Sequence, residues 1–154
     1  MPLDDLQEFV KKLNADADAG HQATLAAAQN YRAAREAFLQ EFRDLADREI
    51  RPVFEAVLLK SDSVTIKLDN RSDLIGLDVY MKKGEAESVS GHLRYRADID
   101  RRQIFREERI DRLPNRDRNL LVHPPSELIE ERIGQIVESL LRDVKYALYN
   151  KRAY

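Results

Sequence analysis

The sequence contains no cysteine, only five glycines and no long apolar run. The lack of cysteine excludes disulfides, thiolate metal sites and cysteine nucleophiles. The glycines form no phosphate-binding loop, because neither G-x-x-x-x-G-K-[ST] nor G-x-G-x-x-G occurs. No apolar stretch approaches the roughly 20 residues that span a bilayer, and the acidic start has no secretory h-region. We therefore expect a cytoplasmic protein.

Apolar residues make up 43% of the chain and charged residues 35%, a balance that argues against disorder. At 154 residues, the chain is long enough to bury about two-thirds of its unfolded surface. We expect a single domain over residues 1–154. The formal net charge of −2 identifies no class of partner by itself.

Helical patterns dominate residues 1–60. Apolar residues from Leu3 to Leu13 recur at spacings of three and four, which predicts a short amphipathic helix. The segment Asn14 to Gly20 predicts either a break or a solvated turn of helix. A second stripe, from Tyr31 to Val57, has a period of about 3.7 residues, longer than the coiled-coil value. It favours a helix packed inside a globular fold over a parallel zipper, with a kink just before Pro52.

Residues 64–110 predict an antiparallel meander of three to four strands, because apolar and polar residues alternate there. The first hairpin should pair Leu68 with Ile75. The second should pair Ile75 with Tyr95, which puts Tyr95 in the core. A fourth strand is expected around residues 102–109, where Ile104 and its neighbour Phe105 compete for the buried face.

Residues 126–150 predict a closing helix with a broad apolar face. Ser126 is the expected N-cap, and the acidic residues after it suit the positive end of the helix dipole. This helix should cover the apolar face of the sheet. The predicted fold class is α+β, with long N-terminal helices, an antiparallel meander and a C-terminal helix packed on the sheet.

The predicted register puts Asp78, Ser90 and His92 on the sheet face opposite the core. These residue types occur in hydrolases, but a serine nucleophile needs a base within reach and converging oxyanion donors. A serine in mid-strand on an open face favours a solvated surface instead. A deep pocket that holds His92 or His123 beside a carboxylate would favour an enzyme. The histidine spacing matches no metal motif, so the sequence predicts no catalytic residue, metal or cofactor.

Arginine is concentrated in residues 94–118, which carry nine arginines and six acidic residues. Arginine suits bidentate contact with carboxylate or phosphate. The interleaved acids leave three interpretations open: local salt-bridged solvation, an acidic protein partner, or nucleic acid. The candidate binding residues are Arg94, Arg96, Arg101, Arg102, Arg106, Arg109 and Arg112.

Residues 15–34 include nine alanines, and such a slim helix surface allows another helix to approach closely. The candidate residues for self-association are Ala23, Ala27, Tyr31 and Ala34. We therefore expect a non-enzymatic protein that binds another protein chain, in the manner of an adaptor or chaperone, and that forms a homo-oligomer. The alternative is a nucleic-acid-binding module that uses the arginine-rich segment.

Overall fold

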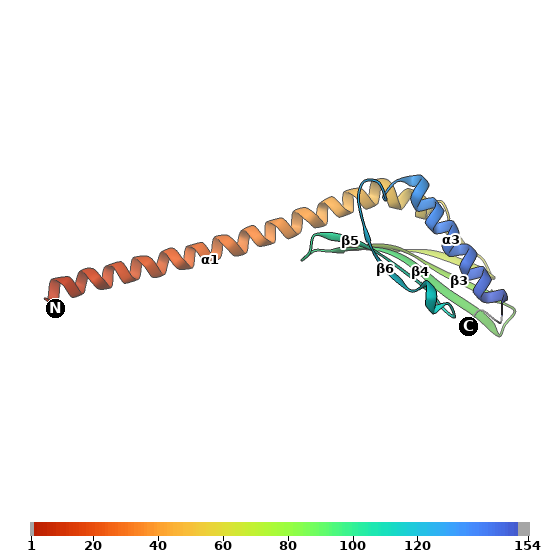
Figure 1. The fold of residues 1–154 in the computed structure, drawn as a ribbon, viewed down its shortest axis with the longest axis horizontal. Coiled ribbons are helices and arrows are strands. Elements are labelled where there is room, and N and C mark those ends of the chain that lie inside the picture. The colour runs from red at the N-terminus through yellow and green to blue at the C-terminus, as the bar shows by residue number, and fades with distance from the viewer. Residues whose placement is uncertain (1, 151–154) are drawn as a thin grey trace. The chain divides into compact units, whose positions relative to one another are not determined.

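The computed structural model describes residues 2–150 of the chain (Figure 1). The chain forms two compact units, with the boundary between Ala37 and Phe38. The elements, in order, are α1 (Leu3–Leu45), a π-helical turn (Ala46–Ile50), α2 (Arg51–Glu55), β1 (Leu59–Lys60), β2 (Val64–Arg71), β3 (Leu74–Lys83), β4 (Glu87–Asp98), β5 (Gln103–Ile110), a 3-10 turn (Pro114–Arg116), β6 (Arg118–Val122) and α3 (Glu130–Tyr149). The predicted α+β class is confirmed, but the sheet has six strands rather than three to four.

Helix α1 is continuous, so of the two predictions for Asn14 to Gly20 the solvated turn of helix is confirmed and the break is wrong. Alanine, the best helix former, alternates with aspartate in that segment, and one interior glycine costs only about 1 kcal/mol. Every residue from Pro2 to Ala33 is exposed. Tyr31, which the sequence pattern placed in the packed stripe, is 54% exposed.

The second unit begins with the last two turns of α1. Phe42 is buried there, and the buried stripe continues through Ile50 and Phe54. The predicted irregularity before Pro52 is confirmed, because Ala46–Ile50 form a π-helical turn. Proline lacks the N–H that a regular helix needs, and the wider turn accommodates the loss.

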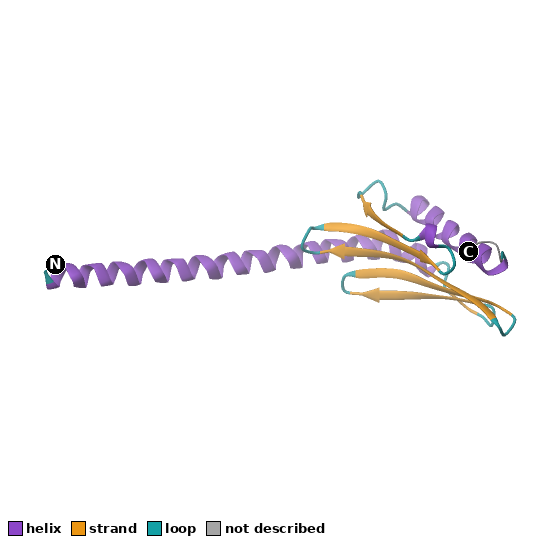
Figure 2. Ribbon diagram, turned by 60° about the horizontal axis from the view of Figure 1, so that its bottom comes forward, coloured by secondary structure: helices purple, strands orange, loops and turns teal. Residues whose placement is uncertain are grey.

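All six strands form one antiparallel sheet in the order β1-β2-β3-β4-β5-β6 (Figure 2). The predicted second hairpin is confirmed, since Ile75 lies opposite Tyr95. The first hairpin is shifted by two residues: Leu68 lies opposite Leu77, not Ile75. Ser72 and Asp73 alone form the connection between β2 and β3. A shift of two preserves the side-chain alternation, so the assignment of faces remains correct.

Strand β5 resolves the competition between Ile104 and Phe105. Ile104 is buried on the core face, and Phe105 lies half-buried on the opposite face. The two outer strands, β1 and β6, were not expected. Strand β6 begins at Arg118 and forms the edge of the sheet next to β5.

Helix α3 lies along one face of the sheet (Figure 1) and buries seven side chains. The helix approaches closely at Gly91 on β4, where an added Cβ would lie 2.8 Å from Cγ2 of Val144. The predicted N-cap at Ser126 is wrong, because α3 begins at Glu130. The Ser126 hydroxyl instead donates to the carbonyl of His123, 3.2 Å away, and stabilises the turn before the helix.

Candidate functional site

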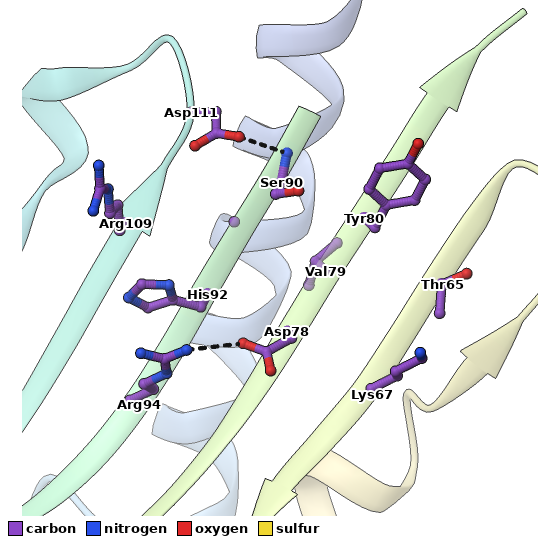
Figure 3. Close-up of a pocket in the computed structure, with 11 residues that line it drawn as sticks. Thr65, Lys67, Asp78, Val79, Tyr80, Ser90, His92, Arg94, Arg109 and Asp111 are labelled. Carbon is purple, nitrogen blue, oxygen red and sulfur yellow. Dashed lines mark hydrogen bonds and ion pairs between the residues drawn. The ribbon is translucent and has the colours of Figure 1, made fainter. Parts of the chain in front are cut away.

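The face of the sheet opposite α3 carries two adjacent rows of polar side chains across strands β2 to β5 (Figure 3). The register of the ladders places them side by side. The first row is Lys67, Asp78, His92 and Arg109. The second row is Thr65, Tyr80, Ser90 and Asp111. The backbone N–H of Ser90 donates to the Asp111 carboxylate at 3.2 Å, which holds that carboxylate at the end of its row.

These rows line an open hollow of about 650 Å³. That volume lies within the usual range of small-molecule pockets. Its remaining lining comes from Val79, Gly91 and Arg94. The sequence placed Asp78, Ser90 and His92 on this face, and the structure puts all three at the hollow (Figure 3).

Arg94 is the fixed cation at the border of the hollow. Its guanidinium lies 3.4 Å from Oδ1 of Asp78 and 4.0 Å from Oδ2 of Asp69. The side chain crosses the neighbouring strand at Gly76, where an added Cβ would come 2.7 Å from Cγ of Arg94. The pairing leaves Asp78 neutralised from within the protein.

His92 is held by a carboxylate from the next strand. Its Nε2 lies 3.1 Å from Oε1 of Glu107, and Oε2 of Glu107 lies 3.2 Å from the guanidinium of Arg96. Because a carboxylate paired with arginine is an acceptor, Nε2 is the donor in this contact. A neutral His92 therefore carries its lone pair on Nδ1.

A histidine beside a carboxylate in a hollow is the arrangement that would favour an enzyme. The serine needed for a hydrolase is not engaged, however: among the described residues, Ser90 and His92 share no hydrogen bond. Ser90 also lies in the middle of a strand, without the converging backbone donors that stabilise an oxyanion. The geometry suits binding better than acyl transfer.

The structure separates the seven candidate arginines. Three of them, Arg94, Arg96 and Arg109, share the open face of the sheet. Two lie in the β4–β5 connection, where Arg101 pairs with Asp98 at 3.8 Å and Arg102 has φ of 53°. The arginines therefore form no continuous strip.

The other two candidates lie away from that face. Arg112 follows β5 with φ of 69°. Arg106 is buried on the core face of β5, 3.8 Å from Glu108, which is also buried. Oε2 of Glu108 in turn lies 3.9 Å from Arg116, whose Nε lies 2.6 Å from Asp143 on α3. Sequence reasoning missed this buried network, because charged residues at alternate positions look like a solvated face.

Tyr95 adjoins the network, and its hydroxyl is buried without a partner at hydrogen-bonding geometry in residues 2–150. Burial raises the pKa of Tyr95 to about 12; the charge of Arg106 lowers the pKa and that of Glu108 raises it. The phenol therefore remains neutral over the physiological range.

The candidate self-association residues lie on α1. Ala23, Ala27 and Tyr31 are exposed, and Ala34 is half-buried. The Tyr31 hydroxyl accepts a hydrogen bond from Arg35 at 2.9 Å. The guanidinium of Arg35 lies 5.3 Å from the centre of the tyrosine ring. These contacts hold Tyr31 along the helix, next to the alanines.

Residues 2–150 contain no group of three or more histidine, aspartate or glutamate side chains placed to hold a metal ion. None of the helices in this part of the chain has the length and apolar character needed to cross a membrane. No family model, curated protein or solved structure matches the chain.

Proposed function

We propose that the protein is a cytoplasmic adaptor that binds another protein and self-associates through α1. The observation that carries the proposal is an exposed apolar stripe along this helix. Leu3 is 72% exposed, Val10 54% and Leu13 58%. Exposed apolar surface in a continuous stripe is a common sign of an interaction surface.

The stripe follows a coiled-coil repeat. Apolar or small residues occur in alternating steps of three and four over residues 3–34: Leu3, Leu6, Val10, Leu13, Ala17, Gly20, Thr24, Ala27, Tyr31 and Ala34. This spacing averages 3.5 residues and keeps one seam facing a partner helix. Residues 3–33 of α1 are all exposed, and an exposed helical stretch of this length gains most of its stability from such pairing.

Charge favours a second copy in the antiparallel orientation. Residues 3–20 carry five acidic and two basic side chains, whereas residues 21–37 carry two basic and one acidic. Parallel pairing would place the acidic half of one helix against the acidic half of the other. Antiparallel pairing places it against the basic half, which lowers the electrostatic energy.

Side-chain size favours the same orientation. Large residues (Leu3, Leu6, Val10 and Leu13) occupy the seam in the first half of α1, and mostly small residues occupy the second half. An antiparallel register that places Leu3 opposite Ala34 also pairs Val10 with Ala27 and Ala17 with Gly20. Each large side chain then meets a smaller one except at Leu6, which meets Tyr31, so the two helices pack at a nearly constant spacing.

Light scattering on the full chain at tens of micromolar tests the proposal. We expect the mass of a dimer. Replacing Leu6→Glu and Leu13→Glu together puts buried charges in the seam and should give a monomer. The matched control, Gln22→Glu with Gln29→Glu, adds the same charge on the outer side of the helix and should remain dimeric. A wild-type monomer at this concentration would refute self-association.

A further inference from the structure

The hollow on the open face has a cation without an ion-pair partner at each end of one row. Lys67 lies at the β2 end and Arg109 at the β5 end, and both side chains are exposed. Within residues 2–150, neither of them forms an ion pair. The positive charge that the protein leaves uncompensated here is therefore concentrated at two separate points (Figure 3).

The two residues of the row that lie between these cations already have partners within the protein. Asp78 pairs with Arg94, and His92 pairs with Glu107. The adjacent row offers hydroxyl groups on Thr65, Tyr80 and Ser90 that make no side-chain hydrogen bond within the described chain. Hydroxyls both donate and accept, so they suit the amide groups of a peptide.

The spacing of the two cations identifies a ligand geometry. Three strand-to-strand gaps of about 4.8 Å separate Lys67 from Arg109, or about 14 Å between their backbones. In an extended peptide, side chains at positions i and i+4 point to the same side and lie about 13 Å apart. Acidic residues at i and i+4 would therefore reach both cations at once.

We propose that the hollow binds an extended acidic peptide segment, with carboxylates four residues apart held by Lys67 and Arg109. A neutral residue at i+2 would lie over Asp78 and His92, which are already paired with Arg94 and Glu107. This assignment rests on the proposed function as a protein-binding adaptor and gives the chemistry of its partner. Guanidinium and carboxylate form charge-assisted hydrogen bonds of matching geometry.

A nucleic-acid strand fits the site less well. Its phosphates follow one another at shorter intervals than the two free cations and continue beyond both ends. Two carboxylates four residues apart match the two cations and place no further anionic group between them.

Fluorescence anisotropy with labelled seven-residue peptides tests the proposal. The probe is Ser-Glu-Ser-Thr-Ser-Glu-Ser, and its matched partner, Ser-Glu-Ser-Glu-Ser-Thr-Ser, has the same composition with the carboxylates two residues apart. We expect the first peptide to bind about tenfold more tightly, since the second reaches only one cation at a time. Equal affinity of the two peptides would overturn the proposal.

Protein variants locate the binding. Lys67→Gln and Arg109→Gln should each weaken binding of the first peptide about tenfold. Arg142→Gln removes the same charge from the outer face of α3 and should leave the affinity unchanged. Unchanged affinity in the Lys67 and Arg109 variants would contradict the assignment. A single-stranded oligonucleotide can also be tested as a competitor of the peptide. If it displaces the peptide, and if both substitutions weaken its own binding, the hollow is a nucleic-acid site and the assignment is contradicted.

The same titration separates this proposal from the one on α1. The hollow is formed within one chain, so the Leu6→Glu, Leu13→Glu variant should bind the first peptide with wild-type intrinsic affinity. Peptide binding by a protein that light scattering shows to be monomeric would support the hollow while refuting self-association. A dimeric protein that binds both peptides equally would support self-association and refute the proposal on the hollow.

Discussion

Gly76 on β3 lies directly opposite Arg94 on β4, and the arginine side chain occupies the space that a Cβ on the glycine would fill. The carbonyl oxygen of Leu93 closes the same space, 2.9 Å from that Cβ position. The missing side chain therefore lets Arg94 cross β3 and approach Asp69 and Asp78. One glycine thus positions the fixed cation of the hollow.

Gly76→Ala should destabilise the protein by about 1–3 kcal/mol, because backbone as well as side chain must move to admit the methyl group. Urea unfolding measures the loss. Gly134→Ala is the matched control: it lies inside α3 with no atom within 4 Å of its Cβ position. That substitution should stabilise the helix by about 0.5–1 kcal/mol. A Gly76→Ala variant as stable as wild type would refute the steric role of this glycine.

Tyr95 should make folding sensitive to alkaline pH. Its pKa is raised from 10.0 to about 12, so the folded state favours the neutral phenol. This effect contributes about 3 kcal/mol to the free energy of unfolding. The contribution is fully present below pH 10 and is lost as the pH rises through 12. Unfolding free energies measured from pH 9 to pH 12 should therefore fall less steeply for Tyr95→Phe. Parallel slopes for wild type and Tyr95→Phe would contradict the burial effect.

Breaking the buried pair of Arg106 and Glu108 should lower the free energy of unfolding strongly, whereas replacing both residues with apolar ones should lower it little. Glu108→Gln leaves the Arg106 charge buried without its carboxylate and should cost about 3–5 kcal/mol. The double variant Arg106→Met, Glu108→Leu removes both charges and should recover most of that loss. Denaturant unfolding compares the variants. A double variant as unstable as Glu108→Gln would contradict this account of the network.

A surface pair on α3 provides the comparison. Glu138 and Arg142 form an ion pair whose side chains are 67% and 74% exposed. Glu138→Gln should change the unfolding free energy by less than about 1 kcal/mol, because water screens exposed charges. A loss as large as that of Glu108→Gln would mean that burial does not set the cost.

The sheet was predictable where alternation is unbroken. From Val64 to Ala97, each strand shows one apolar face, and the faces were assigned correctly although the first hairpin is shifted. Whether a residue number is odd or even determines which face of the sheet its side chain lies on, but only the turn determines which residues pair across the hairpin. A two-residue turn at Ser72 and Asp73 fits the same alternation of faces. Strand β5 was not predictable in this way. Its core-facing positions between Ile104 and Ile110 hold the oppositely charged Arg106 and Glu108, which conceal the alternation.

The undetermined register of β5 also limited the prediction of the site. Asp78, Ser90 and His92 were placed on one face from β3 and β4 alone. Glu107 and Arg109 could not be added, because their side of the sheet depends on the register of β5. In α1, alanine, glycine and threonine at seam positions conceal the 3.5-residue repeat, since none of them has a long apolar side chain. Exposure of the whole stripe is what makes the repeat recognisable.

Distances between spin labels on α1 test the central claim most directly. The chain has no cysteine, so Gln22→Cys or Gln29→Cys provides the single thiol for a nitroxide. In the proposed antiparallel dimer, the two labels are offset along the axis by about 10 Å at position 22 and about 32 Å at position 29. Double electron–electron resonance should therefore give a clearly longer distance at position 29. Equal distances would contradict the antiparallel pairing, and no dipolar coupling at either position would contradict self-association through α1.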